Sequence, residues 1–135
     1  MSSEETVVIT QRLKAVLDLV EDGIYLSDRN GMTLWVNKAY ERLTGHPREY
    51  FNGRYVGELV ESGVFNKVLN PQIVKTKKSA SVVQELGQHR KTIVLRGFPI
   101  LDEKGQVELV ISFARDITAI TQLREQIAGQ RNIIE

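Results

Sequence analysis

Two short blocks, one near each end of the chain, constrain the fold more than any other feature. The first is a predicted strand pair, residues 23–28 and 32–37, joined by Asn30-Gly31. That pair favours a tight hairpin turn, because both residues tolerate a positive φ. Asn37 can then cap a helix that follows at once. The second block is residues 115–118, where the last predicted strand passes directly into a helix.

Helices are predicted before and between these blocks. An i, i+3, i+4, i+7 apolar spacing predicts a helix over about residues 10–21. The helix after Asn37 should run to about Thr44 and end at Gly45. Prolines and glycines limit residues 46–63 to short helical turns. A further helical stretch is expected over 64–69, and Asn70 should cap a last short helix that has Pro71 at its first position and ends near Lys77.

Three long strands are predicted in succession after these helices. They cover about residues 79–87, 90–101 and 106–117, and each is rich in β-branched residues. Residues 87–90 and 102–105 supply the turns between them. The predicted order is therefore helix, two strands, several small helices, three strands and a final helix.

The composition bounds the class of protein. A chain of 135 residues with 41% hydrophobic residues is long enough for one domain with a core. Lys and Arg number 18 against 17 Asp and Glu, spread without a basic stripe, so direct nucleic-acid binding is not expected. No run approaches the roughly 20 apolar residues that span a bilayer, and the start does not resemble a signal peptide. A cytoplasmic location without membrane contact is the expectation.

The last segment carries apolar residues at a 3–4 spacing, at Ile120, Leu123 and Ile127. This spacing is typical of a coiled-coil seam. It is equally typical of a terminal helix that packs on its own domain, and Gly129 weakens both alternatives.

From about Leu13 to Thr118 this order of elements resembles the PAS family. Four stretches, residues 37–45, 83–86, 115–118 and 123–125, look most like the amino-terminal PAS domains of bacterial sigma-54-dependent transcriptional activators. In that family an AAA+ ATPase and a helix-turn-helix domain would follow, and neither is in this sequence. The chain therefore looks like the isolated sensory part.

The resemblance implies an α+β fold of the PAS type, a five-stranded antiparallel sheet with short helices on one face and flanking N- and C-terminal helices. It divides the chain into an N-terminal flanking helix (1–22), a PAS sensor domain (23–118) and a C-terminal signalling helix (119–135).

A PAS cup would enclose a small ligand site between the concave face of the sheet and the helices. By resemblance, the residues expected to contact a small molecule are Tyr25, Ser27, Asn37, Tyr40, Ile93, Leu95, Ser112 and Ala114. Gly97 and Val110 should face the same way, and small residues such as Gly97 and Ala114 would favour a pocket. Strand alternation leaves a second set on the opposite face: Leu26, Trp35, Val94, Leu109, Ile111 and Phe113. The alternative is that the polar members are ordinary core groups and that bulky side chains fill the cup.

Cofactor chemistry is restricted by the absence of cysteine. A covalent flavin adduct needs a cysteine within Gly-x-Asn-Cys, whereas residues 53–57 read Gly-Arg-Tyr-Val-Gly. Haem would need an axial histidine; His46 and His89 lie in predicted turns that should be wet, so haem and metal are not expected. No Gly-x-Ser-x-Gly setting or phosphate-binding glycine loop is present, and the chain is not expected to be an enzyme.

Asp116 and Thr118 can cap the outgoing helix, which makes them candidates for a signalling hinge. A homodimer is expected, with contacts at Leu13, Leu17, Trp35, Ile120, Leu123 and Ile127. Trp35 could instead pack under the first helix. The function expected is sensing a small molecule, or dimerising, to regulate an attached effector. The alternative is a ligand-free dimerisation module of a histidine kinase or another signalling protein.

Overall fold

The computed structural model describes residues 3–63, 68–86 and 91–134. Six helices and five strands follow one another in the order α1 (Ser3–Leu17), β1 (Gly23–Asp28), β2 (Thr33–Val36), α2 (Lys38–Thr44), α3 (Arg48–Phe51), α4 (Val56–Glu61), α5 (Asn70–Thr76), β3 (Ala80–Leu86), β4 (Lys91–Leu101), β5 (Val107–Asp116) and α6 (Thr118–Ile134).

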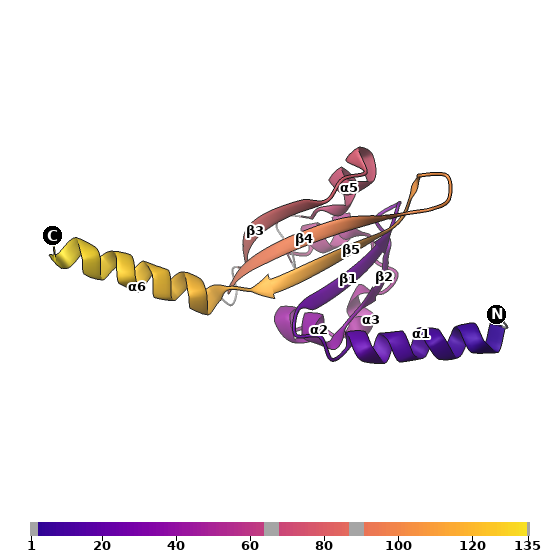
Figure 1. The fold of residues 1–135 in the computed structure, drawn as a ribbon, viewed down its shortest axis with the longest axis horizontal. Coiled ribbons are helices and arrows are strands. Elements are labelled where there is room, and N and C mark those ends of the chain that lie inside the picture. Colours follow the sequence, from indigo (N-terminus) through magenta and orange to yellow (C-terminus); the bar gives the residue numbers. More distant parts are fainter. Residues whose placement is uncertain (1–2, 64–67, 87–90, 135) are drawn as a thin grey trace.

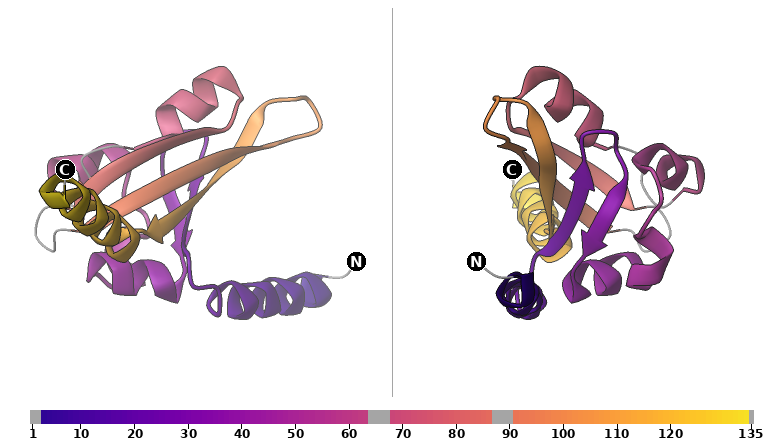
Figure 2. Two further views of the ribbon diagram at one scale, coloured as in Figure 1. Left: turned by 60° about the vertical axis from the view of Figure 1, so that its left-hand side comes forward. Right: turned by 90° about the vertical axis from the view of Figure 1, so that its right-hand side faces the viewer.

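The strands form a single antiparallel sheet with the spatial order β2-β1-β5-β4-β3. The first and last strands, β1 and β5, are therefore neighbours within the sheet, and Tyr25 lies opposite Ser112. The short helices α2 to α5 gather on one face, while α1 and α6 project from the body in opposite directions (Figures 1 and 2). The expected α+β class, with a five-stranded antiparallel sheet, short helices on one face and flanking helices at both ends, is confirmed (Figure 1).

The hydrophobic core lies between the sheet and the short helices. Its buried members come from both layers: Tyr25, Val36, Tyr40, Phe51, Val56, Leu59, Leu69, Ile73, Ile93, Leu95, Val107, Val110 and Ala114. The residues assigned to the opposite face of the sheet are half-buried, apart from Trp35, which is only 5% exposed. The alternation of the strands therefore sorts the side chains between the two faces as expected.

The turn between β1 and β2 differs from the predicted tight hairpin. Gly31 has a φ of 84°, but Asn30 does not have a positive φ. The Gly31 amide donates to the Asp28 carbonyl at 3.1 Å, and the Asp28 carboxylate accepts from the amides of Asn30 and Met32, each at 2.9 Å. A turn followed by a left-handed glycine suits a loop longer than two residues. The prediction of a tight hairpin turn with Asn30 and Gly31 as its two central residues was wrong, because the Asp28 side chain holds a longer loop.

The predicted bounds of the other elements mostly agree with the structure. Helix α1 begins and ends earlier than expected, and Leu17 is its last residue. Asn37 caps α2 and Gly45 ends it with a φ of 77°, both as predicted. The strand bounds agree to within one or two residues. The predicted helix over 64–69 and the turn at 87–90 lie largely or wholly outside the described residues.

Candidate functional site

A cavity of about 30 Å³ lies in the cup between the sheet and the helices. We call it the central cavity. Its walls come from β1, α2, α4, α5, β4 and β5 and from the residues just before α5: Tyr25, Tyr40, Val56, Val68, Leu69, Asn70, Leu95 and Ser112. A volume of this size holds only one or two water molecules, whereas drug-sized ligands occupy pockets of about 300–1,000 Å³.

Aromatic side chains fill much of the cup. The rings of Tyr25 and Tyr40 lie 5.5 Å apart, and Tyr40 meets Phe51 edge-on at 5.3 Å. The Tyr25 hydroxyl is hydrogen-bonded to that of Thr33. Burial raises the pKa of Tyr25 to about 12, and burial raises the pKa of Tyr40 well above its ordinary value. Both phenols are therefore neutral at physiological pH.

Asn70 connects α5 to β1. Its Nδ2 donates to Ser27 Oγ at 2.7 Å and to the Asp28 carbonyl at 2.9 Å. Asn70 was predicted to cap α5, but Leu69 occupies the N-cap position and Asn70 is buried. The cap prediction was wrong because the Asn70 side chain reaches across to β1 instead. The Asn-Pro pattern does not indicate that Asn70 is buried, so the sequence carried no signal for its bond to Ser27.

The structure divides the eight candidate ligand residues among several places. Tyr25, Tyr40, Leu95 and Ser112 line the central cavity. Ser27 accepts from Asn70, and Ile93 is a core residue outside the lining of this cavity. Asn37 is held by backbone groups, and Ala114 lines a second hollow described below. The lining of the central cavity therefore contains four of the eight expected residues.

Gly97 does not leave an opening, although its size suggested one. A Cβ atom at this position would lie 2.4 Å from Ile73 Cδ1 and 3.3 Å from Leu69 Cδ1. The missing side chain therefore lets α5 and the residue before it pack directly on β4. Close packing of a helix on the sheet, rather than ligand space, is what this glycine provides.

The junction between α1 and the domain is built around Asn37, which is fully buried. Its Oδ1 accepts from the amides of Ile24 at 2.8 Å and Tyr40 at 3.0 Å. Its Nδ2 donates to the carbonyls of Leu17 and Asp22 at 2.9 and 3.0 Å. The sequence predicted the cap. It did not predict the bonds to Leu17, the last residue of α1, and to Asp22 in the loop between α1 and β1.

The junction between β5 and α6 is built around Thr118. The Thr118 hydroxyl accepts from the Thr92 amide of β4 at 2.9 Å and donates to Asp116 Oδ1 at 2.5 Å. The same carboxylate oxygen accepts from the Thr118 amide at 2.9 Å, and the Ile117 amide donates to the Thr92 carbonyl at 2.9 Å. The two hinge candidates therefore contact each other and bind α6 to β4 as well as to β5.

The candidate dimer residues on the two long helices are accessible. Leu13, Ile120, Leu123 and Ile127 are exposed, and Leu17 is half-buried. Trp35 differs, because it is buried in its own chain with the Arg48 guanidinium 4.8 Å from its ring centroid. The suggestion that Trp35 anchors a partner is therefore not supported by its position, and Arg48 provides a contact within the chain.

His46 is not the wet turn residue that the sequence suggested. It is half-buried and stacks on Tyr50, with 4.3 Å between the ring centroids. His89 lies outside the described residues. Within the described ranges no three His, Asp or Glu side chains are placed to hold a metal ion, and no helix there is long and apolar enough to cross a membrane.

Comparison with known proteins identifies the fold. A family model described as "PAS fold" matches residues 17–122. The structure is similar to the PAS domain of BvgS from Bordetella pertussis, with a TM-score of 0.67 and 17% identity over 93% of this chain and 98% of that one. It is also similar to a sensory box sensor histidine kinase from Vibrio cholerae, with a TM-score of 0.60 and 19% identity over 87% and 98%.

A third solved structure is also similar. This PAS domain, from a protein of Colwellia psychrerythraea, has a TM-score of 0.60 and 26% identity over 83% of this chain and 98% of that one. None of the curated proteins matches the chain.

Proposed function

The chain belongs to the PAS family, and from this premise we propose that it is a sensory domain that couples the state of its central cavity to the direction of α6. In this proposal a small molecule enters the cup beside Tyr25, Tyr40, Leu95 and Ser112. Its binding shifts β4 and β5, and the shift changes how α6 helices pair in a homodimer. The attached effector reads that pairing.

The junction at Thr118 carries the proposal. Thr118 bonds to the amide of Thr92, the second residue of β4, and to Asp116, the last residue of β5. The same two strands provide Leu95 and Ser112 to the cavity wall. A displacement of either strand at the cavity must therefore either move the start of α6 or break these bonds. Each bond of this kind is worth about 1 kcal/mol, which is within the range of measured allosteric couplings.

The effector we propose is a sigma-54-dependent transcriptional activator. The support is the resemblance of residues 37–45, 83–86 and 115–118 to the sensory domains of that class. A histidine kinase is the alternative effector. Two of the similar structures, one of which is named as a sensor histidine kinase, share less than a fifth of their residues with this chain. They therefore support the fold and not the choice of effector.

A ligand-free dimerisation module is the second candidate, and the size of the central cavity favours it. About 30 Å³ leaves no room for an organic molecule unless Tyr25 or Tyr40 moves. The exposed apolar residues of α1 and α6, such as Leu13 and Leu123, would pair with a second copy. In this version the two helices set the spacing of the effectors.

Native mass spectrometry of the purified chain distinguishes the two candidates. A dimer that retains a small molecule supports the sensor, and replacing Ser112 by Leu should then release that molecule because the larger side chain fills the cavity. An empty dimer supports the scaffold. A monomer with no bound molecule would contradict both candidates.

A further inference from the structure

A second hollow, of about 220 Å³, opens at the base of the sheet and is several times larger than the central cavity. We call it the base hollow. It lies where the α1–β1 loop, α2, the start of β4 and the end of β5 meet. Its lining is Glu21, Gly23, Ala39, Arg42, Leu43, Lys91, Ala114 and Asp116. More space for a guest therefore exists here than in the cup.

Four of the eight lining residues carry formal charges, two acidic and two basic, and none of the four forms an ion pair with another. Arg48–Asp18 and Arg115–Asp22 are ion pairs of the described ranges, and neither includes any of these four residues. Lys91 Nζ donates to the Leu43 carbonyl at 3.3 Å, which uses one of its three donors. Arg42, in the last turn of α2, has no side-chain partner among the residues that the structure describes. Opposite charges thus border one hollow without neutralising one another.

The floor of the base hollow is small and apolar. Gly23, Ala39 and Ala114 are buried there beside Leu43. A Cβ atom on Gly23 would lie 2.9 Å from Tyr40 Cδ2 and 3.5 Å from Ala114 Cβ. The floor therefore rests directly against Tyr40, whose ring also lines the central cavity.

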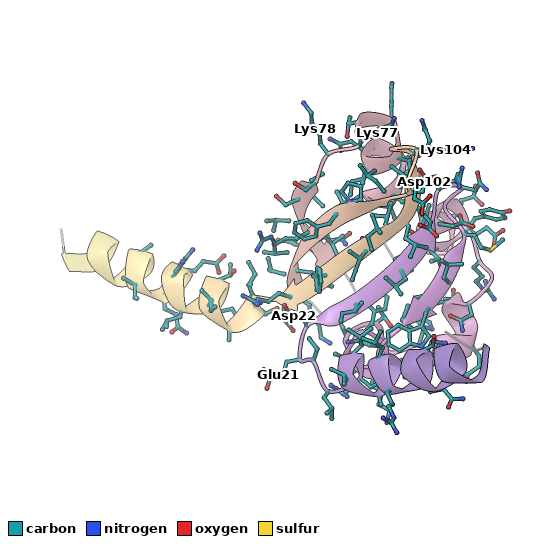
Figure 3. The ribbon with its side chains drawn as sticks, turned by 45° about the vertical axis from the view of Figure 1, so that its right-hand side comes forward. Glu21, Asp22, Lys77, Lys78, Asp102 and Lys104 are labelled. Atoms are coloured by element: carbon teal, nitrogen blue, oxygen red, sulfur yellow. The ribbon has the colours of Figure 1, made fainter. Side chains whose placement is uncertain are left out.

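We propose that the base hollow binds a small zwitterion of the α-amino acid type. The carboxylate of the ligand lies against Arg42 and Lys91, since a guanidinium can bind both oxygens of a carboxylate. The ammonium group lies toward Asp116 and toward Glu21, whose side chain projects from the α1–β1 loop (Figure 3). The side chain of the ligand covers the small apolar floor.

The balance of charge selects a zwitterion over a simple ion. Two positive and two negative side chains leave the lining with no net charge, so a plain anion or cation would be attracted by one pair and repelled by the other. A molecule with both charges satisfies both pairs. The site is separate from the cup, and the proposal does not depend on a ligand in the central cavity.

The position of the base hollow would give such a ligand access to both flanking helices. Asp116 bonds to Thr118 at the start of α6, and Glu21 precedes Asp22, whose carbonyl bonds to Asn37. A zwitterion between Asp116 and the α1–β1 loop would join the two junctions. It would therefore hold α1 and α6 at a fixed relative angle.

The test is an NMR titration of the purified chain with the common amino acids one at a time, beginning with L-leucine. At least one should shift the backbone amides of Ala39, Lys91 and Ala114. For L-leucine the matched probes are 3-methylbutylamine, which lacks the carboxylate, and 4-methylpentanoate, which lacks the ammonium group. Each should bind at least about tenfold more weakly than the amino acid, because each leaves one pair of charges without a partner.

Variants identify the charges involved. Arg42→Gln and Lys91→Gln should each weaken binding by about tenfold, while Arg29→Gln, an exposed change in the β1–β2 turn, should leave it unchanged. Arg42 is exposed, so its loss should not prevent folding. The proposal is overturned if no amino acid shifts these amides, if the amine or the acid binds as tightly as the amino acid, or if the shifts gather around Tyr25 and Leu95. That last result would instead support the cup as the ligand site.

Discussion

The two junctions that carry the long helices use the same chemistry at very different depths. At the N-terminal junction the buried Asn37 amide holds the end of α1 through the carbonyls of Leu17 and Asp22. At the C-terminal junction the hydroxyl of Thr118 and the exposed carboxylate of Asp116 hold the start of α6. Water can replace a lost partner at the second junction but not at the first.

This difference in burial indicates which junction can move. A buried polar group left without a partner costs far more than an exposed one, so breaking the bonds of Asn37 amounts to local unfolding. Breaking the bonds of Asp116 costs little, because its carboxylate is already hydrated. We therefore expect the α1 junction to be a fixed support and the α6 junction to be the adjustable one.

The largest effect is expected at the fixed junction. Asn37→Ala should lower the free energy of unfolding by about 3 kcal/mol, because it removes a helix cap and leaves buried backbone groups without partners. Urea denaturation followed by circular dichroism measures this. Asn37→Asp keeps an acceptor for the amides of Ile24 and Tyr40 but sets a carboxylate oxygen against the carbonyls of Leu17 and Asp22 in a fully buried site, so it should cost at least as much as Asn37→Ala. A loss no larger than that of an exposed cap would show that the two junctions are alike.

Alkaline pH should weaken the cup before it affects the α6 junction. The folded pKa of Tyr25 is about 12 because of its burial, against 10.0 for an ordinary tyrosine. The neutral phenol therefore contributes stability that is fully present below pH 10 and is lost as the pH rises through 12. The loss for this residue is about 2–3 kcal/mol.

Unfolding midpoints measured at several pH values between 9 and 12 would show this decline, with the Tyr25→Phe variant as the matched control. The variant lacks the titrating hydroxyl and should decline less steeply. Identical slopes for the two proteins would exclude Tyr25 as a source of the pH dependence.

A smaller effect on stability, with a larger effect on output, is expected at the adjustable junction. Thr118→Val should cost about 1 kcal/mol, because the Thr92 amide loses its acceptor. Asp116→Ala should cost about 1 kcal/mol or less as a lost cap. In a full-length protein Asp116→Ala should uncouple ligand binding in the central cavity from regulation while binding at that cavity, which Asp116 does not line, is unchanged. Unchanged regulation, or faster hydrogen exchange throughout the core rather than in α6 alone, would contradict this role.

The smallest effect is expected where the two junctions touch each other. Arg115 donates through Nε and Nη2 to the two carboxylate oxygens of Asp22 at 3.1 and 3.0 Å, but its side chain is 68% exposed. The Asp22 hydrogen bond and charge raise the pKa of Arg115 above its ordinary value, so it stays charged throughout. Arg115→Gln should change the stability by less than any variant above, because exposed ion pairs contribute little.

Salt should reveal this contact more clearly than mutation alone. Because exposed charges are screened, the difference in melting temperature between Arg115→Gln and the parent chain should shrink as sodium chloride rises. The ion pair between Asp18 and Arg48, 2.8 Å long and less exposed than Arg115–Asp22, provides the comparison at the N-terminal junction. Its contribution to the melting temperature should depend less on salt. An equal salt dependence at the two ion pairs would contradict the conclusion that the N-terminal junction is buried and the C-terminal junction is exposed.

Local patterns predicted the elements well where the evidence for them is local. The cap at Asn37, the stop at Gly45 and the bounds of the strands depend on residues close in sequence, and the structure agrees with them. The strand order is a property of the family that those blocks resemble. No periodicity within the chain states that β1 pairs with β5, which lies more than 80 residues away.

The candidate site was predicted only in part, because partners distant in sequence decide what a side chain does. Gly97 suggested a pocket, yet Ile73 and Leu69 occupy the space beside it. Asn70 suggested a cap, yet Ser27 takes its amide across 43 residues. Trp35 suggested a partner surface, yet Arg48 covers it. In each case the residue type suggested a role, but the residue that decides the role lies far away in the sequence and could not be predicted from it.

By itself the sequence determined the alternation of faces, the cap at Asn37, the nearly balanced charge and the absence of cysteine, since each of these is set by residue type and spacing. Only the tertiary structure decided that the cup is nearly full, that a larger charged hollow lies beneath it, and that one junction is buried while the other is wet. The reason is that burial and the pairing of polar groups depend on which distant segments meet, and no local pattern records that.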